Sequence, residues 1–280
     1  MNEGSQSSNK WSDLRTRSIS AVVLGVVVLW ALYAGGPWFQ LLMAVMVVLM
    51  ALEYVSITHG GDKRQFAAYA GAGLASVLMP AFGLVATPIG IVVLCGLWCG
   101  ITTNKPYGQS NGWWRLSGTS YVALPALALV LLRADAEWGW NAVLWLVLVV
   151  WATDIGAYFA GRIIGGPKLA PRLSPKKTWA GLTGGMAAAA AISALVCVYL
   201  GLSWHGPTLI APILAVIAQA GDIYESALKR HFNLKDASNL IPGHGGVLDR
   251  VDGLIAAAVA AAALGFLHNP GSVAKGLLLW

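Results

Sequence analysis

Apolar stretches of close to 20 residues recur along this chain, and they restrict its fold more than any other feature does. A helix needs about 20 apolar residues to cross the hydrocarbon core of a bilayer. Nine stretches are candidates: 18–34, 38–57, 66–81, 84–103, 118–132, 141–161, 180–200, 207–224 and 253–268. Because a chain in lipid must satisfy its backbone hydrogen bonds internally, we predict an all-α, polytopic integral membrane protein with about nine transmembrane helices.

The composition argues against a soluble domain. Charged residues make up 11% of the 280 residues, whereas soluble domains are about one quarter charged. The segment 1–17 is polar, and the apolar stretch that follows it is too long for a signal-peptide core. We therefore divide the chain into a cytoplasmic N-terminal tail (1–17), N-terminal membrane helices (18–140), a second membrane region (141–268) and a C-terminal tail (269–280).

The basic residues predict the orientation in the membrane. With the N-terminus in the cytoplasm and nine crossings, all but two of the 18 Lys and Arg residues fall on the cytoplasmic side, and the exceptions are Arg133 and Lys275. Cytoplasmic loops of membrane proteins carry such an excess. Topology thus explains the net charge of +6, and we do not expect nucleic acid as a partner. Two inside loops, 161–179 and 225–252, are rich in charge, which places the expected chemistry at the cytoplasmic face.

Two aspartates lie near the facing ends of consecutive predicted helices. Asp222 is at the inner end of the stretch 207–224, where an unpaired carboxylate is costly and usually functional, and Asp249 precedes the stretch 253–268. If the helices bring them together, they suit Mg²⁺, which binds one or two carboxylates plus substrate phosphates. The alternative is that these charges cap helices and fix topology. The neighbours that would favour a polyphosphate are Lys229, Arg230, Lys235, Arg250 and the glycines Gly243, Gly245 and Gly246.

The same segment resembles the signature of the phosphatidate cytidylyltransferases, which make CDP-diacylglycerol. Residues 226–252 contain Ser-x-apolar-Lys-Arg, then Lys-Asp, then Pro-x-His-Gly-Gly-x-x-Asp-Arg-x-Asp. Residues 154–162 and 168–179 resemble a second block of that family. The chain departs from the family at Ile155, where Thr is more common, and at Ala180, where Glu is often found.

The resemblance implies transfer of the cytidylyl group of CTP to phosphatidic acid, with release of pyrophosphate, in a bacterial inner membrane. Asp222 and Asp249 would bind Mg²⁺, with room for a second cation. The residues expected to meet the phosphates are Lys176, Lys177, Lys229, Arg230 and Arg250, with hydroxyl donors from Ser174 and Thr178. The motif residues Lys235, Asp236, His244, Gly245, Gly246 and Asp252 are expected on the substrate side without separate roles.

Asp154 has two interpretations. It lies near the inner end of the stretch 141–161, where it could pair with Lys176 or Arg162, or could serve the metal and the nucleotide directly. Glu53 is interpreted as a structural pairing partner. The pairs Gly96/Gly100 and Gly181/Gly185 have the spacing of close helix contacts, and we expect them to pack within one chain rather than to form a homodimer.

Two other classes of function stay open at this point. A membrane transporter would carry polar or broken helices near the bilayer midplane, and Pro80, Pro88, Pro125 and Pro212 could break helices. A CTP-dependent polyprenol or phytol kinase would resemble this chain in fold, but would not be expected to carry the whole signature of residues 226–252.

Overall fold

The structure is a computed structural model that describes residues 22–101, 112–238, 240 and 245–280. Its helices are an unlabelled first helix Val22–Ala34, then α2 (Gly36–His59), α3 (Lys63–Leu78), the 3₁₀ turn η1 (Met79–Phe82), α4 (Thr87–Ile101), α5 (Gly112–Arg133), α6 (Gly139–Ile163), α7 (Trp179–Tyr199), α8 (His205–His231), α9 (Leu248–His268) and α10 (Val273–Leu278). Two short strands, β1 (Lys168–Ala170) and β2 (Ser174–Thr178), join α6 to α7.

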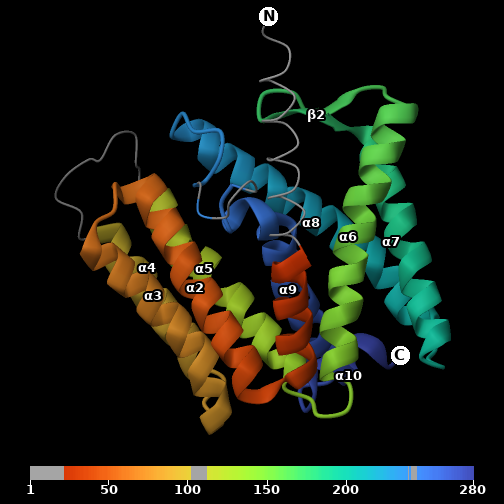
Figure 1. The fold of residues 1–280 in the computed structure, drawn as a ribbon, viewed down its shortest axis with the longest axis horizontal. Helices are drawn as coiled ribbons and strands as arrows, with labels where there is room; N and C mark the ends of the chain where they lie inside the picture. Colours follow the sequence, from red (N-terminus) through yellow and green to blue (C-terminus); the bar gives the residue numbers. More distant parts are fainter. Residues whose placement is uncertain (1–21, 102–111, 239, 241–244) are drawn as a thin grey trace, which may run out of the picture.

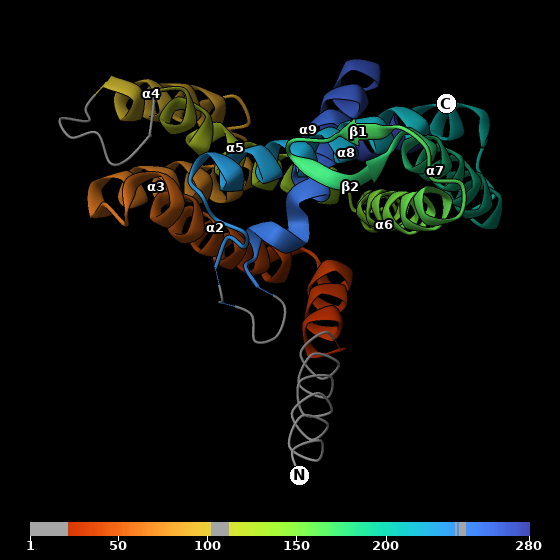
Figure 2. The same cartoon turned by 90° about the horizontal axis from the view of Figure 1, so that it is seen from above.

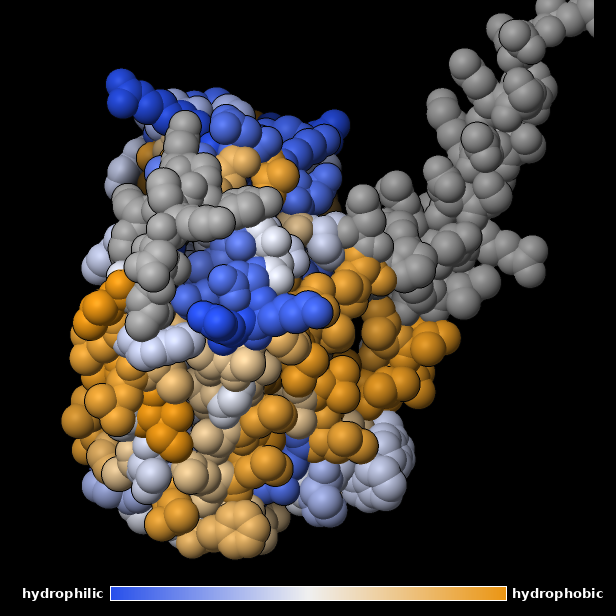
Figure 3. Space-filling model, turned by 90° about the vertical axis from the view of Figure 1, so that its left-hand side faces the viewer, coloured by the Kyte–Doolittle hydropathy of each residue, from blue (hydrophilic) through white to orange (hydrophobic). Residues whose placement is uncertain are grey.

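The helices confirm the prediction of an all-α polytopic membrane protein. Each of the nine predicted stretches coincides with a helix of the described residues. Seven of these helices are long and apolar enough to cross a membrane, and Val22–Ala34 and α4 are shorter apolar helices. On the face drawn in Figure 3, hydrophobic side chains cover most of the middle and lower part and hydrophilic ones gather toward the upper end. The first helix stands apart from the others (Figure 2) and exposes apolar side chains such as Val22 and Val26.

A sharp turn separates α3 from α4 where the sequence contains Pro80 and Gly83. Pro80 lies in η1, and Gly83 ends it with a φ of 75°, a left-handed conformation that glycine adopts without strain. The break that these two residues predict between the third and fourth stretches is therefore present.

Contacts between helix ends show which ends share a side of the molecule. Arg133, at the end of α5, donates hydrogen bonds to the carbonyl oxygens of Leu32 and Tyr33 at the end of the first helix. Ser272, after α9, donates to Asp135 between α5 and α6. Figure 1 shows the α5–α6 connection and α10 at one end and the β-hairpin at the other. These contacts place the end of the first helix, the α5–α6 connection and the segment after α9 on one side of the molecule, in keeping with the predicted topology.

Asp135 helps to fasten α10 at the end opposite the hairpin. Partial burial alone would raise its pKa, but hydrogen bonds from Ser272 and from the backbone of Trp138 and Glu137, together with Lys275, lower it. Lys275 also forms an ion pair with Glu137 at 3.1 Å. The segment 269–280, predicted as a tail, thus contains a docked helix whose Leu277 and Leu278 are fully buried.

Glycines allow the helices that carry the polar motifs to approach closely. A Cβ on Gly181 would lie 2.9 Å from the carbonyl oxygen of Ala157 on α6, and one on Gly185 would lie 2.9 Å from that of Thr153. A Cβ on Gly96 would lie 3.1 Å from the carbonyl oxygen of Leu116 on α5. Both glycine pairs therefore pack within the chain, as predicted. Gly221 plays the same part between α8 and α9, where its Cβ would lie 2.7 Å from the carbonyl oxygen of Asp252.

The predicted loop 161–179 contains a β-hairpin that the sequence analysis did not anticipate. Lys168 pairs with Thr178, and Ala170 pairs with Ser174. Thr178 then ends β2 and caps α7, because its hydroxyl oxygen accepts a hydrogen bond from the backbone N–H of Gly181 at 3.0 Å. Figure 2 shows the hairpin lying over α8, between α6 and α7.

The predicted loop 225–252 also begins later than expected. α8 continues to His231, seven residues beyond the predicted end of its apolar stretch at Tyr224. Glu225, Lys229 and Arg230 are therefore helical residues, with positions fixed relative to Asp222.

Candidate active site

Four acidic side chains form two levels between the antiparallel helices α8 and α9. Asp222 and Glu225 are three residues apart on α8, and Asp249 and Asp252 are three residues apart on α9. Residues three apart share one helix face about one turn apart. Asp222 and Asp252 interact electrostatically at one level, and Glu225 and Asp249 do so at the other.

Lys229 holds the level nearer the α8–α9 connection. Its Nζ lies 2.6 Å from Oε2 of Glu225 and 2.7 Å from Oδ1 of Asp249. The other oxygen of Asp249, Oδ2, accepts hydrogen bonds from the backbone N–H groups of Ala237 and Gly246, both at 2.9 Å. Asp249 thus links Lys229 to two points of the α8–α9 connection.

Lys177, which lies on the hairpin strand β2, pairs with the other level of the cluster. Its Nζ lies 2.6 Å from Oδ2 of Asp222. Asp154 on α6 is close enough to repel Asp222 electrostatically, and its Oδ1 accepts a hydrogen bond from Nε2 of Gln219 at 3.1 Å. Arg162, one predicted partner of Asp154, instead donates to the hydroxyl of Tyr158 at 2.9 Å.

A cavity of about 300 Å³ lies between the hairpin, α6, α7 and α8. This volume is at the lower end of the range for small-molecule sites. Acidic, basic, amide and hydroxyl groups line it together with the small residues of the α6–α7 contact: Asp154, Ala157, Tyr158, Lys176, Lys177, Thr178, Gly181, Leu182, Gln219 and Asp222. A polar cavity with two lysines beside two carboxylates has the chemistry to take an anionic group together with a cation.

The charges of the cluster fit a divalent cation. The cluster contains five carboxylates: Asp154, Asp222, Glu225, Asp249 and Asp252. Among the described residues, three of them form ion pairs, Asp222 with Lys177 and both Glu225 and Asp249 with Lys229. Glu225 is 1% exposed, and among the described residues its Oε1 has no hydrogen-bond partner. An excess of negative charge in a partly buried cluster is costly without a cation.

No three acidic, His or Cys side chains form a ready metal site in the described part of the chain. Mg²⁺ binds one or two carboxylates and completes its coordination with water and substrate phosphates, so a Mg²⁺ site stays a prediction. Asp222 and Asp249 lie on different levels of the cluster, each with a lysine partner, and their sharing of one cation stays a prediction.

The remaining predicted site residues lie around this cluster. Ser174 begins β2, and Lys176 is exposed on it. Arg230, Lys235, Asp236 and Arg250 are exposed near the α8–α9 connection, where Arg230 donates to the carbonyl oxygen of Leu234 at 3.3 Å. Gly245 has a φ of 79° and Gly246 is buried. His244 and Gly243 lie outside the described residues.

Sequence reasoning missed two polar residues of the cluster. Glu225 has the i, i+4 spacing to Lys229 of a helical ion pair, but the helix was predicted to end at Tyr224. Gln219 is a polar residue within an apolar stretch, a signal that should have marked it as a candidate.

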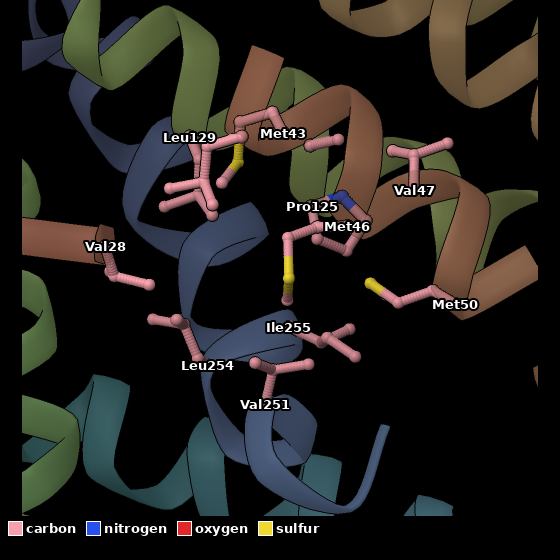
Figure 4. A pocket seen from close by; sticks show the side chains of 12 residues that line it. Val28, Met43, Met46, Val47, Met50, Pro125, Leu129, Val251, Leu254 and Ile255 are labelled. Atoms are coloured by element: carbon pink, nitrogen blue, oxygen red, sulfur yellow. The ribbon is translucent and has the colours of Figure 1, made fainter. Parts of the chain in front are cut away.

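Two further cavities lie along α9, beside residues 251–259. One, of about 260 Å³, is lined by residues that include Ser117, Tyr121, Tyr224 and Ile255. The Tyr121 hydroxyl is buried without a hydrogen-bond partner among the described residues. The other, of about 130 Å³, is wholly apolar and is drawn in Figure 4, where Met43 and Met46 of α2 approach Val251, Leu254 and Ile255 of α9. Pro125 and Ile255 line both cavities.

These features define a class: a polytopic membrane protein with a polar, phosphate-compatible cavity at one end of its helices and apolar cavities beside it. Comparison with known proteins narrows the class, because the model of the cytidylyltransferase family matches residues 15–268. The chain belongs to this family.

Curated relatives are similar over nearly the whole chain. A phosphatidate cytidylyltransferase of Brucella suis is 41% identical over 251 residues, which are 88% of this chain and 91% of the relative. A phosphatidate cytidylyltransferase of Pseudomonas aeruginosa is 39% identical over 272 residues, which are 90% of this chain and 96% of the relative.

Proposed function

We propose that this protein transfers the cytidylyl group of CTP to phosphatidic acid, producing CDP-diacylglycerol and pyrophosphate. One observation carries the proposal for this site: the Lys177–Asp222 ion pair, at 2.6 Å, borders a polar cavity next to Asp154. A family member with a cation-and-anion site open at one end of its membrane helices is suited to joining a water-soluble nucleotide to a lipid.

The reaction requires no nucleophilic side chain. An oxygen of the ionised lipid phosphate attacks the α-phosphorus of CTP, a new P–O bond forms, and the bond from that phosphorus to the bridging oxygen of the β-phosphate breaks. The electron pair leaves with pyrophosphate. Two anionic groups, the lipid phosphate and the triphosphate of CTP, must meet for this step, so the protein contributes by positioning them and by neutralising their charge.

We assign the triphosphate of CTP to the cavity between the hairpin and α8. There Lys176 and Lys177 would face its phosphates. Asp222, with Asp252 and Asp154 beside it, would hold Mg²⁺, and Asp249 is the further ligand that the sequence suggests. When bound, Mg²⁺ would neutralise charge on the phosphates as pyrophosphate leaves.

We assign phosphatidic acid to the α9 side of the cluster. Its phosphate would approach the carboxylate-bound cation there, and the Tyr121 hydroxyl is a donor for the glycerol esters. The apolar cavity of Figure 4 is suited to a segment of acyl chain, because each buried methylene contributes about 0.8 kcal/mol and the lining is apolar throughout.

Position-specific labelling of CTP tests this function against a CTP-dependent lipid kinase. Purified protein is mixed with phosphatidic acid, a polyprenol, Mg²⁺ and CTP labelled at either the α- or the γ-phosphate. Cytidylyl transfer places only the α-label in the lipid fraction, whereas a kinase places only the γ-label there. Label in neither lipid product, together with solute uptake into proteoliposomes, would instead support a transporter.

The proposal includes a location. We place the protein in the bacterial inner membrane with the hairpin end in the cytoplasm, where CTP is made. The support is the exclusion of all but two of the 18 Lys and Arg residues from the other side.

A further inference from the structure

Glu53 is a fully buried carboxylate of α2 that lies outside the cavity assigned to CTP. It is 0% exposed. Its Oε1 accepts hydrogen bonds from the Val247 backbone N–H at 2.8 Å and from the Ser238 hydroxyl at 2.5 Å, and its Oε2 accepts one from the Leu248 N–H at 2.8 Å. A buried charge persists only where hydrogen bonds or opposite charges compensate it. Here the compensation comes from the beginning of α9, 194 and 195 residues away along the chain.

The beginning of α9 has no cap of its own. The N-cap residue is Val247, whose side chain makes no capping hydrogen bond. The first N–H groups of a helix need acceptors, and a carboxylate is favoured there by the helix dipole. Glu53 therefore acts as the N-cap of α9 from another helix, and Asp249 and Asp252 follow within the first turns.

Glu53 and Asp249 together tie the middle of the α8–α9 connection to the start of α9. Glu53 binds Ser238 in the connection and Val247 and Leu248 at the start of α9, while Asp249 accepts hydrogen bonds from Ala237 in the middle of the connection and from Gly246 near its end.

This arrangement also explains a motif glycine. A Cβ on Gly246 would lie 2.8 and 3.0 Å from the two Glu53 oxygens and 2.9 Å from the Cβ of Ala237. Gly246 is thus required for the close approach of Glu53, and its part in substrate binding stays a prediction.

We infer that Glu53 is a positioning residue of the active site, which sets the start of α9 so that Asp249 meets Lys229 and Asp252 meets Asp222. The inference rests on the proposed function for its catalytic consequence, but its structural part stands on the contacts alone. It assigns α2 a role in the reaction although Glu53 touches neither substrate.

The test is Glu53→Gln, which keeps the size of the side chain but leaves one acceptor oxygen for two backbone N–H groups. We expect kcat for CDP-diacylglycerol formation to fall about 10- to 100-fold, as small misplacements of reacting groups do. KM for CTP should change less than about 3-fold, because β2, α6, α7 and α8 line the cavity assigned to CTP and no residue of α9 does. Without any substrate, amide hydrogen exchange of the peptides covering 245–250 should become faster. Glu53→Asp, which keeps the charge, should recover part of kcat.

Ser76→Ala is the control. Ser76 is also fully buried, but its hydroxyl donates only to the carbonyl oxygen of Ala72 within α3, so kcat and exchange at 245–250 should stay at wild-type values. A purely structural role of Glu53 would lower thermal stability while leaving kcat per folded molecule and exchange at 245–250 unchanged, and that result would overturn the inference.

A second variant covers the case in which Glu53→Gln does not fold. Gly246→Ala leaves Glu53 intact and pushes its carboxylate from the other side, and it should give the same kcat loss and the same faster exchange. Wild-type activity in Gly246→Ala would contradict the inference. If wild-type protein makes no CDP-diacylglycerol, the proposed function fails, while unchanged exchange in both variants would reject the positioning role independently.

Discussion

Lys177 and Asp222 come from different parts of the second membrane region, β2 and α8, yet they are held 2.6 Å apart. A partly buried ion pair that loses one member leaves an uncompensated charge. Each residue therefore helps to keep the other in place. If CTP and a cation bind here as proposed, Asp222 would hold the cation and Lys177 would contact a phosphate, so both charges would keep a partner. The level formed by Lys229, Glu225 and Asp249 is arranged in the same way.

Asp249 shows how one side chain can serve both fold and site. Both of its oxygens already have partners, since Oδ1 meets Lys229 and Oδ2 accepts two backbone N–H bonds. A metal at Asp249 would have to share or displace Lys229. Asp222 is the carboxylate more accessible to a cation, because its pair with Lys177 borders an open cavity. We therefore expect Asp222 to be the more sensitive position for catalysis and Asp249 to affect folding as well.

At the scale of elements, the close approach of α8 and α9 brings the carboxylates together, and Gly221 permits it. A Cβ at Gly221 would lie 2.7 Å from the carbonyl oxygen of Asp252 and 2.8 Å from the Cβ of Ala256. We predict that Gly221→Ala lowers the free energy of unfolding by about 1–3 kcal/mol through overpacking. The rate of cytidylyl transfer should also fall, because a wider spacing of α8 and α9 would move the paired carboxylates apart. Thermal unfolding in detergent and steady-state transfer measure the two effects.

Gly71→Ala is the matched control. Gly71 lies inside α3 with nothing within 4 Å of its ideal Cβ position, so alanine there should be neutral or stabilise the helix by up to about 1 kcal/mol. Equal stability and transfer in the Gly221 and Gly71 variants would show that the α8–α9 approach does not need glycine.

The elements differ in how well the sequence predicts them. Each predicted apolar stretch coincides with a helix, because lipid imposes one simple rule on length and hydropathy. This rule applies only to segments that lie within the lipid. The last two turns of α8, which contain Glu225 and Lys229, are polar and were taken for a loop. The strands β1 and β2 are three and five residues long, too short for the alternating pattern that marks a strand.

At the scale of the whole molecule, the site is assembled from both halves of the chain. Charges at the facing helix ends predicted Asp222, Asp249 and Lys229, and the resemblance added Lys177, because both signals are local in sequence. The contact of Glu53 with Val247 could not be predicted, since it joins residues 194 apart through backbone atoms that carry no sequence signature. The pairing of carboxylates across α8 and α9 depends in the same way on how two helices pack, and spacing along the chain does not specify it.

The orientation of the molecule is tested by labelling single cysteines in intact cells. We predict that a membrane-impermeant maleimide reacts with Glu137→Cys, at the end opposite the hairpin, and not with Arg172→Cys at the hairpin tip; both positions are exposed. The background would have Cys95, Cys99 and Cys197 replaced by alanine. Labelling of Arg172→Cys alone would reverse the proposed orientation and place the cavity outside the cytoplasm.

We propose that CTP and phosphatidic acid react at the carboxylates between α8 and α9. This location is tested by comparing cytidylyl transfer from α-labelled CTP by wild type, Asp222→Asn and Asp62→Asn. Asp62 caps α3 through the Arg64 backbone N–H, a role that asparagine fulfils equally well. We expect Asp62→Asn to transfer the cytidylyl group at the wild-type rate. In folded Asp222→Asn the rate should fall at least about 100-fold, as it does when an enzyme loses a group that stabilises developing charge. Transfer by Asp222→Asn at the wild-type rate would contradict the claim.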